Sequence, residues 1–212
     1  MKLFKYKSCE HIEDVIINSR LYCSVFNKLN DPMEWAFNSK LNSKDIENLL
    51  SGTNKESWRI CCLSRAEQFG LMWSLYGDSH QGVCIEIELD QPVNNTVTID
   101  NKQWNCKDVD YKVSADLLNG ENNDVLPVIF TKSKQWEPEQ EFRLVSKCQG
   151  SCDVYIPVNI TRIYLGKRMS SENKDKIKKM CDSKHISIID MSDDPVEFPI
   201  NYWNDCNNRE YL

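Results

Sequence analysis

The stretch VCIEIEL at residues 83–89 alternates between two kinds of side chain. Val83, Ile85 and Ile87 fall on one side of the alternation, and Glu86 and Glu88 fall on the other. A repeat of two is that of a β-strand, because successive side chains of a strand point to opposite faces of a sheet. The stretch therefore predicts a half-buried strand and places a sheet at the centre of the fold.

Shorter patterns on both sides of this strand predict the rest of the fold. Further strands are expected at residues 3–7, 21–26, 59–64, 96–99, 109–112, 141–145, 154–158, 160–165 and 186–189. Helices are expected at residues 11–18, 44–50, 67–76 and 170–181, while residues 128–136 fit either a helix or an extended segment. Because strand outweighs helix, the predicted fold class is α+β, with mixed, mainly antiparallel sheets and peripheral helices.

The length of 212 residues favours a single domain over residues 1–212. We expect the core of this domain to span about residues 3–190, with the tail 191–212 packing back onto it. The polar stretch at residues 90–124 is expected to be a plain surface excursion or a flexible lid.

Composition narrows the class of protein. A hydrophobic fraction of 41% suits a globular core and excludes a disordered or collagen-like chain. No apolar run approaches the roughly 18 residues that span a bilayer, and no signal peptide is visible, so a cytoplasmic protein without a membrane partner is expected. The ten cysteines include no C-x-x-C spacing, so we expect free thiols and no bound metal. The net charge of −6 gives no general attraction to nucleic acid.

The stretch WEPEQEFRLV at residues 136–145 is the best candidate for chemistry. If the backbone is extended from Glu139 onward, then Glu139, Glu141 and Arg143 share one face, and Phe142 and Leu144 anchor the other. We therefore expect the three charged residues on one strand, facing a cleft. Carboxylates beside a like and an opposite charge can take different chemical tasks. An exposed face of ion pairs is the alternative, and spacing alone favours it.

Two further groups of residues are weaker candidates. Trp73 and Tyr76 are three residues apart on the expected helix, and Ser64 and Arg65 come just before this helix in the sequence. The two aromatic side chains could stack on a nucleobase or nicotinamide ring. Core packing is the commoner fate of such aromatic residues. The stretch KYK at residues 5–7 could bind phosphate, although lysines at a strand end are more often solvated. The stretch NDPME at residues 30–34 is interpreted first as a turn.

Taken in order, these segments resemble the bacterial domain-of-unknown-function family 2971. The segments are KY at 5–6, LNDPME at 29–34, LMWSLYG at 71–77 with GVCI at 82–85, Lys132 with W-x-x-E-x-E-x-R at 136–143, and ITRIYLG at 160–166. The family has no settled activity, and its members look like accessory or phage-defence proteins of bacteria. The resemblance, over about residues 3–190, therefore implies a fold boundary and a site but no reaction.

A weaker resemblance is to ADP-ribosyltransferase folds. These folds present a basic or aromatic first strand, a later Ser or Thr, and a last strand with Glu-x-Glu, and here KYK, Ser64 and Glu139-x-Glu141 follow that order. The sequence departs from the pattern because a lysine must replace the usual Arg or His, and because Arg65 follows the serine.

This second resemblance implies a toxin- or defence-like transferase or glycohydrolase that uses NAD as its substrate. Glu141 would face the charge that develops at the ribose, Glu139 would orient the acceptor, and Arg143 or a lysine would hold the pyrophosphate. On this reading Glu141→Gln should keep the fold and abolish turnover. The residues expected to contact the nucleotide are Lys5, Tyr6, Lys7, Ser64, Arg65, Trp73, Tyr76, Lys132 and Trp136. A protein or a nucleic acid could be the acceptor.

Two alternatives come from other classes of function. Residues 160–185 hold eight Lys or Arg against three acidic residues, so a nucleic-acid-binding or nuclease-like effector is possible, although a solvated helix face is the commoner meaning. A non-enzymatic sensor or interaction module is the third reading.

Overall fold

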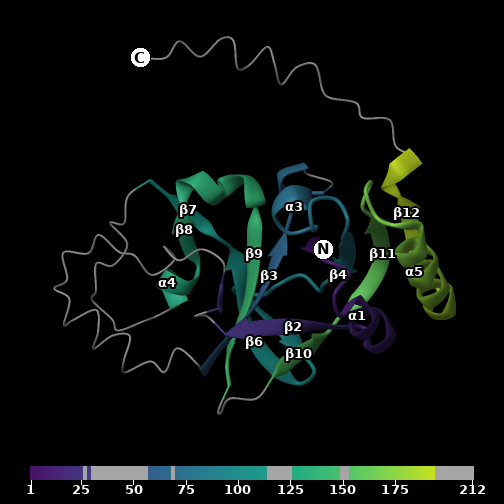
Figure 1. Ribbon diagram of the computed structural model, residues 1–212. Helices are drawn as coiled ribbons and strands as arrows, with labels where there is room; N and C mark the ends of the chain where they lie inside the picture. Colours follow the sequence, from purple (N-terminus) through teal and green to yellow (C-terminus); the bar gives the residue numbers. More distant parts are fainter. Residues whose placement is uncertain (26–27, 30–56, 68–69, 114–125, 149–152, 194–212) are drawn as a thin grey trace, which may run out of the picture.

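The structure is a computed structural model that describes residues 1–25, 28–29, 57–67, 70–113, 126–148 and 153–193. It shows an α+β fold with a mostly antiparallel sheet and few helices (Figure 1). The helices are α1 (Ile12–Asn18), α3 (Gly70–Leu75), α4 (Leu126–Ile129) and α5 (Ser171–Lys184), with 3-10 turns η3 (Lys134–Glu139) and η4 (Met191–Asp193). The strands are β1 (Lys2–Lys7), β2 (Arg20–Val25), β3 (Trp58–Ser64), β4 (Val83–Glu88), β5 (Thr96–Ile99), β6 (Lys102–Asp108), β7 (Asp110–Lys112), β8 (Thr131–Ser133), β9 (Glu141–Lys147), β10 (Val154–Pro157), β11 (Asn159–Leu165) and β12 (Ser187–Asp190).

The main sheet has ten strands, eight of them in the order β12-β11-β4-β1-β3-β9-β6-β5. Its pairings are antiparallel except for that of β11 with β12. Strand β2 pairs with both β3 and β10, off the main path, and β7 and β8 form a small parallel sheet of their own. Among the described residues, no helix is long and apolar enough to cross a bilayer.

Helices cover both faces of the sheet. Ile16 of α1 and Ile177 of α5 pack in one hydrophobic core with Ile85 of β4, and α1 and α5 lie side by side in Figure 1. On the opposite face, Trp73 of α3 packs in a second core with Phe4 of β1. The predicted cap of α5 is confirmed, because the Ser170 side chain accepts a hydrogen bond from the backbone N–H of Asn173.

Strand β4 is buried on both faces rather than on one. Cys84 and Glu86, which the alternation assigned to the open face, are both buried because β4 lies between β1 and β11 under the second core. Burial of the Glu86 carboxylate is tolerated because Thr161 and Tyr164 donate hydrogen bonds to it at 2.7 and 3.0 Å, and Lys2 lies at 3.3 Å.

Other sequence predictions need correction. Residues 102–108, expected within a polar excursion, form β6 and bury Trp104 and Cys106 in the main core; only these two apolar residues marked the strand. Residues 128–136 divide among α4, β8 and η3. The expected helix at 44–50, the turn at 30–34 and the tail beyond 193 lie outside the described residues. The eight described cysteines are free thiols, with Cys152 and Cys206 outside that range.

Strand β3 changes its neighbour along its length, and this splits the sheet. Arg59 and Ile60 pair with β2, whereas Ser64 pairs with Phe4 of β1. Between these points β1 and β2 diverge. The Cys62 carbonyl in the gap accepts a hydrogen bond from the Lys5 ammonium at 2.8 Å. A sheet that opens in this way exposes the middle of β3 to a ligand.

Candidate functional site

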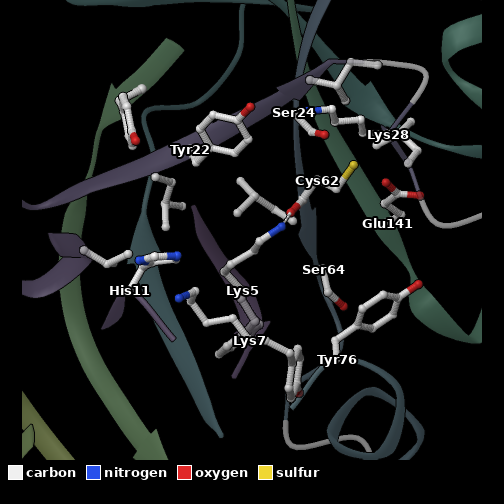
Figure 2. A pocket seen from close by; sticks show the side chains of 18 of the residues that line it. Lys5, Lys7, His11, Tyr22, Ser24, Lys28, Cys62, Ser64, Tyr76 and Glu141 are labelled. Carbon is white, nitrogen blue, oxygen red and sulfur yellow. Dashed lines mark hydrogen bonds between the residues drawn. The ribbon is translucent and has the colours of Figure 1, made fainter. Parts of the chain in front are cut away.

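A cavity of about 830 Å³ lies in the split between β1 and β2 (Figure 2). This volume is within the range of small-molecule sites, about 300–1,000 Å³. The cavity brings together side chains from α1, α3 and six strands. The charged and aromatic residues that line it are Phe4, Lys5, Tyr6, Lys7, His11, Asp14, Arg20, Tyr22, Lys28, Tyr76, Lys132, Glu139, Glu141, Asp153 and Tyr155.

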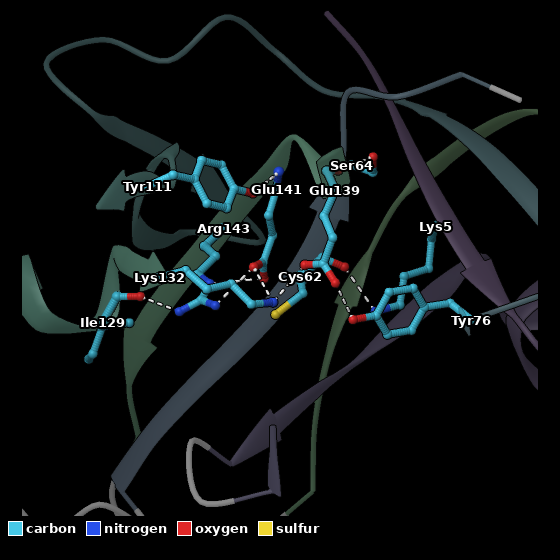
Figure 3. Close-up of polar contacts among 10 residues, drawn as sticks. All are labelled: Lys5, Cys62, Ser64, Tyr76, Tyr111, Ile129, Lys132, Glu139, Glu141 and Arg143. Atoms are coloured by element: carbon cyan, nitrogen blue, oxygen red, sulfur yellow. Dashed lines mark hydrogen bonds and ion pairs between the residues drawn. The ribbon is translucent and has the colours of Figure 1, made fainter. Parts of the chain in front are cut away.

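Two carboxylates and two cations form a buried cluster at one side of the cavity (Figure 3). The Lys132 ammonium lies 2.6 Å from Glu139 and 3.3 Å from Glu141. The Arg143 guanidinium binds Glu141 through Nε and Nη2, both at 2.9 Å, and also donates to the Ile129 carbonyl. The four side chains are almost completely buried, and their two positive charges balance the two carboxylates.

The prediction of one strand carrying Glu139, Glu141 and Arg143 is wrong for Glu139. Residues Lys134–Glu139 form the 3-10 turn η3, and Gln140 adopts a left-handed conformation with φ 45° before β9 begins at Glu141. Pro138 has a fixed φ that suits the turn, and the Gln140 N–H closes it by donating to the Glu137 carbonyl. Glu139 and Glu141 still meet, because Lys132 of β8 bridges them.

Of these three residues, Glu139 and Glu141 line the cavity and Arg143 is fully buried behind them. Burial by itself would raise the pKa of Glu141, but Arg143 and Lys132 outweigh it and lower the pKa to about 2. Glu141 is therefore ionised at neutral pH. It receives two hydrogen bonds from Arg143 and one from Lys132, which occupy three of the roughly four acceptor positions of a carboxylate.

Glu139 is held differently. One carboxylate oxygen accepts a hydrogen bond from the Tyr76 hydroxyl and the other accepts one from Lys132. Two of its roughly four acceptor positions therefore stay open toward the cavity. Its backbone carbonyl is fixed by the Ser64 hydroxyl at 2.6 Å, so the carboxylate is positioned by both its side chain and its main chain.

Lysines lie on the other side of the split. Lys5 and Lys7 of β1 both line the cavity, and burial together with the charge of Lys5 lowers the pKa of Lys7. Two ammonium groups of one strand in a concave site suit an anionic ligand group such as a phosphate. A phosphate would relieve their mutual repulsion.

Four of the predicted site residues are not among the residues that line the cavity. Trp73 is buried and packs edge-to-face on Tyr6 at 5.4 Å, so its role is core packing. Arg65 forms an ion pair with Asp108 on the surface. Trp136 lies beside the cluster, with its ring centroid 4.9 Å from the Lys132 ammonium. The prediction that they line the site is wrong for Trp73, Arg65, Trp136 and Arg143, whereas Lys5, Tyr6, Lys7, Ser64, Tyr76, Lys132, Glu139 and Glu141 line it.

Strands β2 and β10 supply the opposite wall through Arg20, Tyr22 and Tyr155, which were not predicted from the sequence. A signal was present in the alternation of residues 21–26, which puts Tyr22 and Ser24 on one face. Among the described residues, no group of three His, Cys, Asp or Glu side chains could hold a metal ion.

The basic segment at residues 160–185 is partly neutralised within the fold. Lys174 and Lys178 both pair with Asp190, at 2.8 and 3.4 Å. Lys176 pairs with Glu13 at 3.7 Å, and Arg162 lies 3.6 Å from the buried Glu86. These contacts favour the interpretation as a solvated helix face with ion pairs inside the fold. They do not favour a surface that binds the phosphates of a nucleic acid.

The depressed pKa of Glu141 predicts a pH dependence of stability. Its usual pKa is 4.5 and its folded pKa is about 2, so it stabilises the fold above about pH 5 and loses that contribution as the pH falls toward 2. The full contribution is about 3 kcal/mol. We expect the difference in unfolding free energy between wild type and Glu141→Gln to be largest above pH 5 and to shrink toward pH 2. Urea unfolding at several pH values measures it; a constant difference would contradict the assignment.

Comparisons with known proteins identify one family. Residues 72–144 match the model of a protein family of unknown function, DUF2971. No curated protein and no solved structure matches the chain. The matched region holds Tyr76, Lys132, Glu139 and Glu141, and it is narrower than the span of the resemblance seen in the sequence. The match supports that resemblance, and the part of the chain that is similar to DUF2971 supplies the two carboxylates of the site.

Proposed function

We propose that the protein binds NAD in the split of the sheet and cleaves the bond between nicotinamide and ribose, as a transferase or glycohydrolase with an ADP-ribosyltransferase-like fold. The observation that carries the proposal is the polarity of one cavity: Glu139 presents a buried carboxylate with open acceptor positions, and Lys5 and Lys7 present ammonium groups across from it. A dinucleotide needs both kinds of group, because its ribose offers hydroxyl donors and its pyrophosphate carries negative charge.

Cleavage would leave positive charge on the ribose. As the bond between C1′ and the pyridinium nitrogen breaks, its electron pair leaves with neutral nicotinamide, and an oxocarbenium-like sugar remains. A fixed carboxylate that accepts a hydrogen bond from a ribose hydroxyl stabilises this state more than the ground state. Water or another acceptor then adds to C1′ and loses a proton, which gives ADP-ribose or its conjugate.

The structure leads us to assign the two carboxylates roles different from those expected from the sequence. Three of the acceptor positions of Glu141 are occupied by Arg143 and Lys132, so it is better suited to holding Lys132 in place. Glu139 keeps open positions in the cavity and is therefore the candidate catalytic residue. Burial raises the pKa of the Cys62 thiol, and the Glu141 carboxylate raises it further, so Cys62 is not a thiolate nucleophile.

The ADP-ribosyltransferase resemblance gains support from position. The first strand, the Ser64 strand and the Glu139-x-Glu141 segment come from three distant parts of the chain, and all three line one cavity. The segments that the weaker resemblance picked out in order are thus neighbours in space.

Release of nicotinamide tests the proposal. The purified full chain is incubated with NAD at neutral pH, without and with a protein or nucleic-acid acceptor, and nicotinamide is quantified by chromatography. We expect release above that of a boiled sample. No release under any of these conditions, from protein whose fold is confirmed by circular dichroism, would overturn the proposed reaction and favour the sensor reading.

A further inference from the structure

Two tyrosines form the wall of the cavity on the side opposite the carboxylates. Tyr22 of β2 and Tyr155 of β10 are directly opposite each other in the antiparallel register, with ring centroids 5.5 Å apart and planes at 65°. Both line the cavity, yet they remain 42% and 38% exposed. Large aromatic rings left this accessible inside a concave site have apolar faces that a ligand can cover.

The fold holds this wall in place through charged neighbours. The Arg20 guanidinium lies 4.0 Å from the centroid of the Tyr155 ring. It donates two hydrogen bonds to the Asp14 carboxylate, from Nη2 at 2.7 Å and from Nε at 3.1 Å. Burial and the nearby Asp153 carboxylate both raise the pKa of Tyr22. Arg20 therefore covers one face of Tyr155, and the Tyr22–Tyr155 pair is fixed before any ligand arrives, which lowers the entropic cost of stacking on it.

The wall and the carboxylates lie on opposite sides of β3. Strand β9, which carries Glu141, pairs with one edge of β3, and β2, which carries Tyr22, pairs with the other. In Figure 2, Tyr22 and Glu141 stand on different sides of the cavity, and Lys5 lies between them in that view. Tyr22 and the carboxylate of Glu141 thus lie apart in the cavity, with the Lys5 side chain between them in the view of Figure 2.

We propose that the Tyr22–Tyr155 pair is the binding subsite for the adenine base of a dinucleotide. This inference rests on the proposed function and adds the orientation of the ligand: adenine against β2 and β10, pyrophosphate at Lys5 and Lys7, and nicotinamide ribose at Glu139. Stacking on aromatic side chains suits a purine because it uses the π-face of the base. Near the carboxylates, Trp73 is buried in the core, and the hydroxyl of Tyr76 is already bound to Glu139.

Calorimetric titrations of the full chain with ADP and with nicotinamide mononucleotide test the subsite. ADP carries the adenine and the pyrophosphate, and the mononucleotide carries only the nicotinamide half. We expect Tyr22→Ala and Tyr155→Ala each to weaken ADP binding about tenfold or more, because stacking on one aromatic ring contributes that much to affinity. Tyr22→Phe, which keeps the ring, should stay within about twofold of wild type, and the mononucleotide should be affected by none of the three.

The outcomes separate this inference from the proposed reaction. ADP binding that is insensitive to both alanine variants, or that is absent from wild type although NAD is cleaved, overturns the subsite and leaves the reaction standing. Tyrosine-dependent ADP binding without NAD cleavage supports the subsite and overturns the reaction. Equal losses for ADP and for the mononucleotide would mean that the tyrosines hold the fold of the wall, and would also overturn the assignment.

Discussion

Arg143→Met is expected to lower the free energy of unfolding by about 3–5 kcal/mol at pH 7. Arg143 is fully buried, and its guanidinium makes two hydrogen bonds of 2.9 Å to Glu141. Methionine is apolar and of comparable length, so packing is largely kept while the charge is lost. Lys132 then faces two buried carboxylates alone, and one of them is left uncompensated. Urea unfolding followed by circular dichroism measures the change.

Arg65→Met is the matched control for this experiment. Arg65 also pairs with a carboxylate, that of Asp108, and its guanidinium lies 5.0 Å from the centroid of the Phe142 ring. Its side chain is 38% exposed, so its ion pair is solvated and its loss should cost less than about 1 kcal/mol. In addition, the double variant Arg143→Met/Glu141→Gln should be less destabilised than the sum of its single variants. Similar losses for Arg65→Met and Arg143→Met would contradict the structural role of the cluster.

The strands could be predicted well because their signal is local. Strand β9 was expected from the alternation of Phe142 and Leu144, and both side chains are buried in the main core. The central strand β4 was found by the same repeat, but its burial on both faces depends on neighbours from distant parts of the chain. Periodicity reports the conformation of a segment, whereas the number of covered faces is decided by tertiary packing.

The cavity could not be predicted from the sequence for the same physical reason. It depends on β3 pairing with β2 at one end and with β1 at the other. No local pattern in residues 58–64 predicts this change of neighbouring strand. The carboxylates were identified as a pair, but extended backbone was assumed for Glu139. Pro138 was present in the sequence as a sign of a turn, and the left-handed Gln140 completes it.

The position of Glu141 also changes what its substitution is expected to do. From the sequence, Glu141→Gln is a shape-conserving change that removes only a charge. In the structure that charge neutralises Arg143 and Lys132 in a buried site, so a loss of stability is expected together with any loss of turnover. Glu139 is the better residue for testing the chemistry, since Lys132 keeps Glu141 as its partner when Glu139 becomes neutral.

Glu139→Gln is expected to lower the rate of nicotinamide release by about 10²–10³-fold while the fold is kept. Glutamine has nearly the shape of glutamate, and its amide oxygen can still accept the Lys132 hydrogen bond. The negative charge that would stabilise the oxocarbenium-like state is lost. Because this interaction acts mainly in the transition state, kcat should fall and the KM for NAD should change little. Steady-state measurements of nicotinamide release against NAD concentration give both values.

Glu137→Gln is the matched control, because the same chemical change is made two residues earlier in the same turn η3. Glu137 is half exposed and pairs with Lys134 at the surface, away from the residues that line the cavity. Its substitution should leave both kcat and KM as in wild type. A folded Glu139→Gln variant with unchanged kcat would remove Glu139 from the chemistry. A large rise in KM with constant kcat would instead show that Glu139 binds the ground state and the transition state equally, which is the behaviour of a binding residue and not of a catalytic one.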